Sequence, residues 1–476
     1  MSARPIACAI AAVLLSACAS MPPSREADST AQAAIAADWP SDIGQNTPEG
    51  ISPIPAWETF FTDPQLQDLI RTALANNHDL QLATLRIQEA QAAYRIQRAD
   101  QLPTIGINAD HTRAGIPDAY QPLLGSSVAE GNVASVGFSS WELDLWGRVR
   151  NLKRAALQNY LATSEAQRAV QISLIEQVAN QYLTLCETDE RIALTERTIQ
   201  SRADSFHLFK RRLDVGSISR LQLTQVETLL VQAQAIGAQL KQQRAAQAHA
   251  LQVLLGTPGD SLSTTPGALA ESTFTPLAPG LPSGLLTQRP DLMAYEHKLQ
   301  ASRANVAAAR AAFFPTISLT GLAGSASPDL SNLFDSGTGT WLFRPNLVLP
   351  IFDSGRRRAN LSLNRARESM AVVGYEKAVQ TAFREVSDAL SSRTWLTEQV
   401  NIQQHGVDVL SERARLATLR YEAGSTAYLD VLDAQRDLLS AQQQLISAQR
   451  ALATSHVALY AALGGGQPTP NEPTAR

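Results

Sequence analysis

A stretch of sequence that occurs twice constrains the fold of this chain more than any other feature. The first copy starts at Leu213 and reads Leu-Asp-Val-Gly-Ser-Ile-Ser-Arg-Leu-Gln-Leu; the second starts at Tyr421 and reads Tyr-Glu-Ala-Gly-Ser-Thr-Ala-Tyr-Leu-Asp-Val. An offset of 208 residues aligns Gly216 with Gly424. After each glycine, small and apolar residues recur at alternating spacings of three and four, which is the pattern of a coiled-coil seam. The repeat therefore predicts a duplicated helical hairpin with a glycine turn.

The duplication covers most of the chain. Matching dipeptides recur first at an offset of 212 residues and then at 208: Asp79-Leu80 with Asp291-Leu292, and Gly147-Arg148 with Gly355-Arg356. This change predicts that the loop of the second strand pair is four residues shorter. Both copies end at Leu-Gly, where glycine can adopt the left-handed C-cap conformation: Leu255-Gly256 and Leu463-Gly464. Each repeat is therefore interpreted as helix, strand, loop, strand, very long helix, glycine turn and helix.

Local patterns define the other elements. A helical pattern opens at Asp63-Pro64 and runs to about residue 99, before Pro103. Extended patterns and polar loops alternate with the helices: strands at 104–110 and 133–146, a loop at 114–132 between them, and a corresponding loop at 327–338.

The lengths of the elements decide the architecture. A helix from 148 to 214 would be about 100 Å long at 1.5 Å per residue, and no globular domain of this size needs such a rod. The strands have about ten residues, the length of a tilted barrel strand in a membrane. Four strands cannot close a barrel, because at least about eight are needed to enclose even a filled interior. Closure therefore requires oligomerisation; three copies give twelve strands, and two or four copies also satisfy the arithmetic.

The N-terminus indicates an exported lipoprotein. Arg4 precedes an apolar run over 6–15, and small residues follow it in Leu-Ser-Ala-Cys, which ends at Cys18. A positive charge, a short apolar core and small residues at the cut are typical of a secretory signal. The ending resembles a bacterial lipoprotein signal, in which Cys18 becomes the lipidated first residue. An ordinary signal peptide with a chance cysteine is the alternative.

These signals divide the chain into six segments. They are a lipoprotein signal peptide (1–17), a lipid anchor with an extended segment (18–64), repeat 1 (65–256), an inter-repeat linker rich in Pro, Gly and Ser (257–288), repeat 2 (289–464) and a disordered polar tail (465–476).

Three features together resemble one family. They are the lipoprotein signal, the duplicated order of helices and strands, and the Gly-Ser turn followed by Leu-Asp-Val-Leu-Asp-Ala-Gln at 429–435. The mature chain is similar over essentially its whole length to the TolC-like outer-membrane factor family, in the lipoprotein branch that serves multidrug RND pumps. Further likenesses lie at 141–148 (Trp-Glu-Leu-Asp-Leu-Trp-Gly-Arg), 289–292 (Arg-Pro-Asp-Leu) and 314–315 (Phe-Pro).

The resemblance implies an α+β membrane protein. Its expected form is a trimeric 12-stranded β-barrel, with four strands per chain, that continues into a long periplasmic α-helical barrel of coiled coils. An equatorial belt from the N-terminal segment and the linker would surround the helices. The implied function is an outer-membrane exit duct of a tripartite efflux system, a passive gated channel that expels drugs or other small toxic compounds. The implied partners are two further copies of the chain, a periplasmic adaptor (membrane fusion) protein, an inner-membrane transporter and outer-membrane lipid of a Gram-negative bacterium.

The resemblance also assigns roles to residues at the two turns. Gly216, Ser217, Gly424 and Ser425 match the periplasmic tip, where the adaptor docks and the duct closes. An ionic pair that joins the tips in some relatives is absent, because its positions hold Gln222 and Thr426. A contact between Tyr421 and Gln222 is the remaining candidate.

Four residues after the second turn match the periplasmic gate: Leu429, Asp430, Asp433 and Arg436. Spacing by three places the two aspartates and the arginine on one helix face. Threefold symmetry would convert each aspartate into a ring of three carboxylates, which selects for cations at a narrow neck. Spacing alone favours solvated charges on an exposed helix; the family likeness favours the gate.

Other function classes have little support in the sequence. The net charge of −4 does not suggest nucleic acid as a partner. The seven histidines lack metal-ligand spacing, and no catalytic constellation or cofactor motif emerges, so an enzyme is not predicted. Two alternatives remain: the duct of a type I protein secretion system, and a lipid-anchored periplasmic coiled-coil scaffold. The transported substrates and the particular adaptor are not encoded in this chain.

We expect Cys18 to be acylated and the protein to reach the outer membrane, because Ala19 replaces the aspartate that retains lipoproteins at the inner membrane. Cys18→Ser should abolish incorporation of radiolabelled palmitate. Label that persists in this variant would show that the anchor is assigned wrongly.

Overall fold

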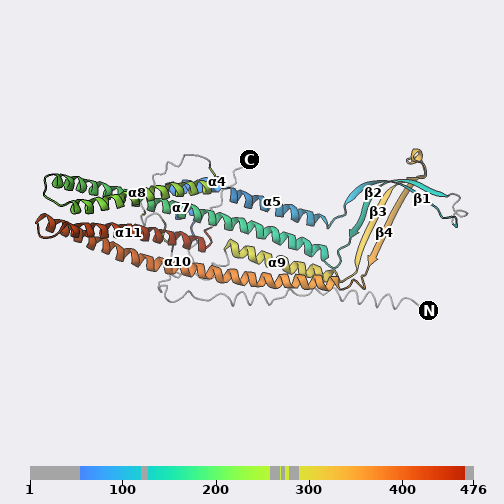
Figure 1. Ribbon diagram of the computed structural model, residues 1–476. Coiled ribbons are helices and arrows are strands. Elements are labelled where there is room, and N and C mark those ends of the chain that lie inside the picture. Colours follow the sequence, from blue (N-terminus) through green and yellow to red (C-terminus); the bar gives the residue numbers. More distant parts are fainter. Residues whose placement is uncertain (1–53, 120–126, 258–268, 270–273, 278–288, 467–476) are drawn as a thin grey trace.

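Two helices of 67 residues each, α7 (Arg148–Asp214) and α10 (Arg356–Glu422), run along the whole helical part of the molecule (Figure 1). The computed structural model describes residues 54–119, 127–257, 269, 274–277 and 289–466. The predicted signal peptide and Cys18 lie outside these residues, as do 18–53, most of the linker at 257–288 and the tail from 467. The helix predicted from 148 to 214 is confirmed at both ends.

Shorter helices cover the two long ones. They are α3 (Trp57–Phe60), α4 (Pro64–Asn76), α5 (His78–Ala99), α8 (Arg220–Leu255), α9 (Pro290–Ala311) and α11 (Tyr428–Ala462). In the half next to the strands, α5 packs on α7, and α9 packs on both α7 and α10. In the other half, α8 packs on α7, while α11 packs on α10 and α7. The helices therefore form one elongated layer in which short helices succeed each other along the long ones.

The strands form one antiparallel sheet in the order β1–β2–β3–β4. They are β1 (Ile105–Gly115), β2 (Val128–Glu142), β3 (Thr316–Ser327) and β4 (Gly339–Val348). The pairing of β2 with β3 joins the hairpins of the two repeats. The predicted loop at 327–338 is confirmed between β3 and β4.

The other predicted loop, at 114–132, is too long. β1 continues to Gly115 and β2 starts at Val128, because polar residues of the two strands pair across the hairpin. His111 Nδ1 lies 2.9 Å from Asn132 Oδ1. The predicted four-residue shortening lies mainly in the strands, since β2 has 15 residues and β4 has 10. The segment predicted to extend to 146 ends at Glu142, which binds Arg148 at the start of α7 (Nε–Oε1 2.9 Å).

The helix predicted from 64 to 99 is two helices. Asp63 caps the first, as expected, since its Oδ1 accepts a hydrogen bond from Gln65 N at 2.8 Å. Asn77 then separates α4 from α5. Its Oδ1 accepts from Leu80 N (3.0 Å) and caps α5, while its Nδ2 donates to Leu254 O at the end of α8 (2.9 Å). A capping side chain within a helical pattern therefore marks the break.

Two contacts between helix ends are central to the fold. At the first joint, the end of α8 at Gly256 meets the start of α5 at Asn77. At the second joint, the end of α11 at Gly464 meets the start of α9 at Arg289. Both predicted C-cap glycines have positive φ, +64° at Gly256 and +98° at Gly464. Each repeat thus builds the same end-to-end arrangement.

The main apolar core lies beside these joints, where parts of α7, α10 and α11 meet the segments at 57–61 and 274–277. Phe60 stacks on Tyr460 with ring centroids 4.4 Å apart, and Thr275 N donates to Phe60 O at 2.8 Å. Described parts of the N-terminal segment and of the linker therefore pack together on the helices, where the resemblance placed the belt. Cys186 is buried in this core, and burial raises the pKa of its thiol to about 12.

The two glycine turns lie at the end of the molecule opposite the strands (Figure 1). The turn between α7 and α8 and the turn between α10 and α11 are at the left in this view, and the sheet is at the right. The orientation predicted from the sequence is confirmed.

We expect Gly256→Ala to destabilise the protein more than the control Gly216→Ala. Both glycines have positive φ, which costs about 1 kcal/mol for alanine. A Cβ at Gly256 would lie 2.3 Å from Asn76 O, whereas a Cβ at Gly216 has nothing within 4 Å. The overlap should cost a further ~1–3 kcal/mol. Thermal unfolding in detergent measures the difference. Equal melting temperatures of the two variants would show that the end of α8 can move away from Asn76 without loss of stability.

Candidate functional site

The two turns at the tip have the same hydrogen-bond geometry. The serine after each glycine donates its N–H and its hydroxyl to the carbonyl five residues earlier: Ser217 to Arg212 O (2.8 Å each) and Ser425 to Arg420 O (2.9 Å each). The N–H bond is that of a Schellman motif, in which the preceding residue adopts the left-handed conformation. The glycines at the turns have φ of +75° and +71°. The Gly-Ser pair of the repeat is therefore explained by helix capping.

A small second core joins the two hairpins near the tip. This tip cluster consists of Phe209, Val226 and Leu432, surrounded by Phe206, Ile218, Leu223, Leu229, Tyr421 and Tyr428. The ring of Tyr428 lies 4.3 Å from that of Phe209 and 4.8 Å from that of Tyr421, measured between centroids. Burial raises the pKa of Tyr428, and a hydrogen bond with Ser205 offsets only part of this effect. The α7–α8 and α10–α11 hairpins are thus held together by aromatic packing.

Arg212 adds a polar bond to this packing. Its Nη1 donates to Tyr421 OH at 2.7 Å, and its guanidinium carbon lies 5.6 Å from the ring centroid of Phe209. The candidate pair of Tyr421 with Gln222 is not formed within the chain. Gln222 instead forms a capping box with Ser219 at the start of α8, where Ser219 N donates to Gln222 Oε1 at 2.9 Å. Arg212 thus hydrogen-bonds Tyr421 across the two hairpins, in addition to the bond between Tyr428 and Ser205.

The structure places the four predicted gate residues on the first three turns of α11. Leu429 is 47% exposed. Asp430 is exposed and accepts a hydrogen bond from Thr426 Oγ1. Asp433 and Arg436 form an ion pair within the chain, with Oδ1 and Nη1 3.2 Å apart.

Two further charged residues, which the sequence patterns did not single out, extend this pair. Arg436 Nη2 also lies 3.2 Å from Asp437 Oδ1, and Arg413 of α10 reaches Asp437 Oδ2 at 2.8 Å. Hydrogen bonds from Arg413 and then Arg436 lower the pKa of Asp437. Arg413 precedes Gly424, and Asp437 follows it, by nearly the same number of residues along the sequence. Residues at equal separations from the turn face each other in an antiparallel hairpin. That symmetry is the signal that could have identified the pair.

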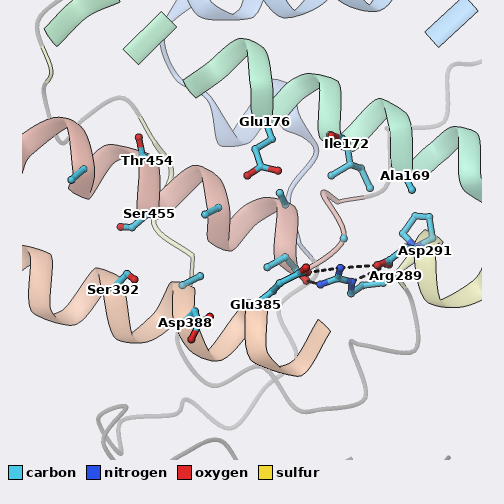
Figure 2. Close-up of a pocket in the computed structure, with 18 of the residues that line it drawn as sticks. Ala169, Ile172, Glu176, Arg289, Asp291, Glu385, Asp388, Ser392, Thr454 and Ser455 are labelled. Carbon is cyan, nitrogen blue, oxygen red and sulfur yellow. Dashed lines mark hydrogen bonds and ion pairs between the residues drawn. The ribbon is translucent and has the colours of Figure 1, made fainter. Parts of the chain in front are cut away.

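A second polar region surrounds the second joint (Figure 2). A cavity of about 560 Å³ lies between α7, α10 and α11, with small residues and several carboxylates on its walls. Arg289 is held there by Asp291 and Glu385, and Glu176 of α7 lies across the cavity. Burial and the nearby charge of Glu385 raise the pKa of Glu176. Arg289 and Asp291 belong to a stretch that the family likeness had singled out without a role.

Two negative findings concern the described residues alone. No group of three or more His, Cys, Asp or Glu side chains there could hold a metal ion. In the same part of the chain, no helix combines the length and the apolarity needed to cross a membrane.

Comparisons with known proteins agree on one class. The family model described as outer membrane efflux protein matches residues 69–257 and 281–465. The chain is 40% identical over 461 residues to the probable efflux pump outer membrane protein TtgC of Pseudomonas putida, covering 96% of this chain and 94% of that protein. It is 42% identical over 441 residues to the toluene efflux pump outer membrane protein TtgI of the same species (91% and 93% covered). Outer membrane protein OprJ of Pseudomonas aeruginosa is 40% identical over 457 residues (96% and 94% covered).

Solved structures show the same fold. The crystal structure of CusC superposes with a TM-score of 0.81 at 36% identity, over 90% of this chain and 98% of that one. The open state of the Neisseria gonorrhoeae outer membrane channel MtrE gives a TM-score of 0.81 at 35% identity, over 91% and 96%.

We expect Tyr421→Phe to loosen the tip without disrupting its packing. The ring stays in the tip cluster, but Arg212 loses its acceptor, which should cost about 1 kcal/mol. Amide hydrogen exchange around 205–232 and 415–435 should accelerate about fivefold. The control Arg413→Gln breaks a more exposed pair and should change exchange there by less than about twofold. Equal acceleration in both variants would contradict a specific role of the Arg212–Tyr421 bond.

Proposed function

Because this chain belongs to the outer membrane efflux protein family, we propose that the first turns of α11 form the gate of an efflux duct. The chain is the outer-membrane exit duct of a tripartite efflux system, and it extends from the outer membrane into the periplasm. Its fold is that of the trimeric channels of this family, in which four strands per chain contribute to a barrel that continues into a helical barrel. The function expected from the sequence is confirmed at this level.

The proposed cargo is a range of small toxic organic compounds. Relatives with 40–42% identity carry names that refer to efflux of toluene, solvents or antibiotics. These names support efflux over the type I secretion duct considered above. The duct functions as a trimer with pump partners; as particular partners we propose a periplasmic adaptor at the tip formed by Gly216, Ser217, Gly424 and Ser425, and an inner-membrane transporter. Acylated Cys18 would add contact with outer-membrane lipid.

The observation that carries the gate proposal is the ion pair between Asp433 and Arg436 at the tip end of α11. Leu429 precedes Asp433 by one helical turn and remains half exposed in the single chain, so it is free to contribute an apolar collar in the trimer. Three symmetric copies would place three Leu429 side chains, which form one collar, and three ion pairs around the axis. Each pair lies within one helix and neutralises an Asp433 carboxylate, so the three pairs together lower the repulsion that would oppose closure; at a partly exposed site each contributes only about 1 kcal/mol.

The charges around Arg436 explain why its removal should favour opening. Arg436 lies between Asp433 and Asp437, and Asp437 has a second partner in Arg413. Without Arg436, Asp437 stays paired and Asp433 does not. Three unpaired Asp433 carboxylates would then repel each other across the axis.

We expect Arg436→Ala to raise the conductance of the purified trimer in planar bilayers, and Asp433→Ala to weaken both its cation selectivity and its block by multivalent cations. The control Arg71→Ala removes an exposed i,i+3 pair with Asp68 on α4 and should leave all three properties unchanged. A trimer whose conductance and selectivity ignore both gate substitutions would place the gate elsewhere.

A further inference from the structure

The two joints use equivalent positions but different chemistry. Asn77 and Arg289 correspond at the offset of 212 residues, and Leu254 and Ala462 correspond at 208. At the first joint, Asn77 Nδ2 donates to Leu254 O at 2.9 Å. At the second joint, Arg289 Nη1 donates to Ala462 O at 2.7 Å. The same helix-end carbonyl is therefore satisfied by a neutral amide in one repeat and by a guanidinium in the other.

The guanidinium of Arg289 joins three helices, as Figure 2 shows in part. Besides the α11 carbonyl, it binds Asp291 of α9 through Nε (3.0 Å) and Nη2 (2.8 Å). Its Nη2 also donates to Glu385 Oε2 of α10 at 2.7 Å. The amide of Asn77 caps α5 and reaches α8 but makes no ion pair. Only the joint on the gate-bearing hairpin is thus fixed by charge among the described residues.

Arg289 is held firmly because its charge is buried. Its side chain is 9% exposed. Burial lowers the pKa of Arg289, but hydrogen bonds and charge attraction from Asp291 and Glu385 offset this, and the pKa is raised overall. Removing a carboxylate leaves the buried guanidinium with less compensation, whereas Asp291 and Glu385 are themselves 38% and 40% exposed.

The position of this joint gives it leverage over the gate. α11 has 35 residues and is about 52 Å long. The joint holds its C-terminal end, and the gate residues lie at its N-terminal end. A tilt of about 1° at the joint would move the far end by about 0.9 Å, by the length of such a helix.

The cavity beside the joint provides room for such a tilt. Small side chains from three helices line it: Ala169 and Ser173 of α7, Ala389 and Ser392 of α10, and Ala451 and Ala458 of α11. A cavity of about 590 Å³ also lies beside the first joint, against Leu80 and Gln81 of α5. There, however, the backbone at Gly256 packs against Asn76, with an ideal Cβ position 2.3 Å from Asn76 O. The second joint therefore differs in its looser C-cap glycine and in the charged contact that resists movement.

We propose that Arg289 is a positioning residue of the gate: by binding Asp291, Glu385 and the α11 carbonyl, it fixes the tilt of α11 and keeps the tip closed. This inference rests on the proposed location of the gate on α11. It assigns a role in gating to a contact far from the tip, on the hairpin that carries the gate and not on the other.

Pulsed EPR on the full trimer tests the proposal directly. A spin label on Ser425→Cys, in a Cys186→Ser background, reports the distances between the three tips. Arg289→Asn, which copies the first joint, should lengthen and broaden these distances, and Arg289→Lys, which keeps the charge without the planar fork, should give an intermediate result. The milder Glu385→Gln should shift them in the same direction if Arg289→Asn fails to assemble. The matched control Arg244→Asn breaks an Arg–Asp pair with Asp189 in the other hairpin and should leave the distances unchanged.

Conductance separates this proposal from the gate itself. Arg289→Asn should raise the resting open probability in planar bilayers about tenfold, which corresponds to ~1.4 kcal/mol of lost closure energy. If Arg436→Ala raises conductance while Arg289→Asn and Glu385→Gln leave distances and conductance as in the wild type, the gate stands and the joint proposal is wrong. If Arg436→Ala has no effect, the gate assignment is wrong. Whatever the result for Arg436, unchanged tip distances in the Arg289 and Glu385 variants would overturn the joint proposal.

Discussion

The length difference between the two 67-residue helices and their shorter partners is the constraint on which the rest of the structure depends. A helix of that length is about 100 Å long, and no single neighbour of 22 to 36 residues can span it. Two short helices must therefore meet end to end beside each long one. Helix ends carry unsatisfied N–H and C=O groups, so each meeting point needs a capping side chain. Asn77 and Arg289 meet that need.

The two repeats share this geometry but divide the tasks. The first repeat has a neutral, closely packed joint and a hairpin that ends in the capping box at Ser219. The second repeat has an ionic joint and an ion pair near the start of α11. Duplication preserved the backbone plan because the packing of long helices requires it. The side chains at equivalent positions were free to differ, and the differences concentrate on the hairpin that carries the proposed gate.

Contacts between hairpins differ from contacts within a hairpin at the tip. Within the second hairpin, charged residues equidistant from the turn pair across antiparallel helices, as in Arg413 with Asp437. Between the hairpins, aromatic packing around Tyr428 and the bond from Arg212 to Tyr421 dominate. Exposed ion pairs contribute little stability and are easily exchanged, whereas buried rings hold the two hairpins together. The tip therefore contains two kinds of contact: stable aromatic packing between the hairpins, and weaker ion pairs on the exposed surface of the second hairpin.

The sequence by itself determined the duplication, the long helices, the glycine turns at one end and the helix face that carries Asp433 and Arg436, because each depends on periodicity or on the backbone conformation of single residues. Tertiary structure alone decided the break at Asn77, the extension of β1 and β2 past the predicted loop, and the partners of Tyr421 and Arg289. These features depend on groups that are remote in sequence: Asn77 bonds Leu254, Arg212 bonds Tyr421, and Arg289 bonds Ala462. Local patterns report what a segment prefers on its own. They do not report which distant carbonyl or ring a side chain meets when the helices pack.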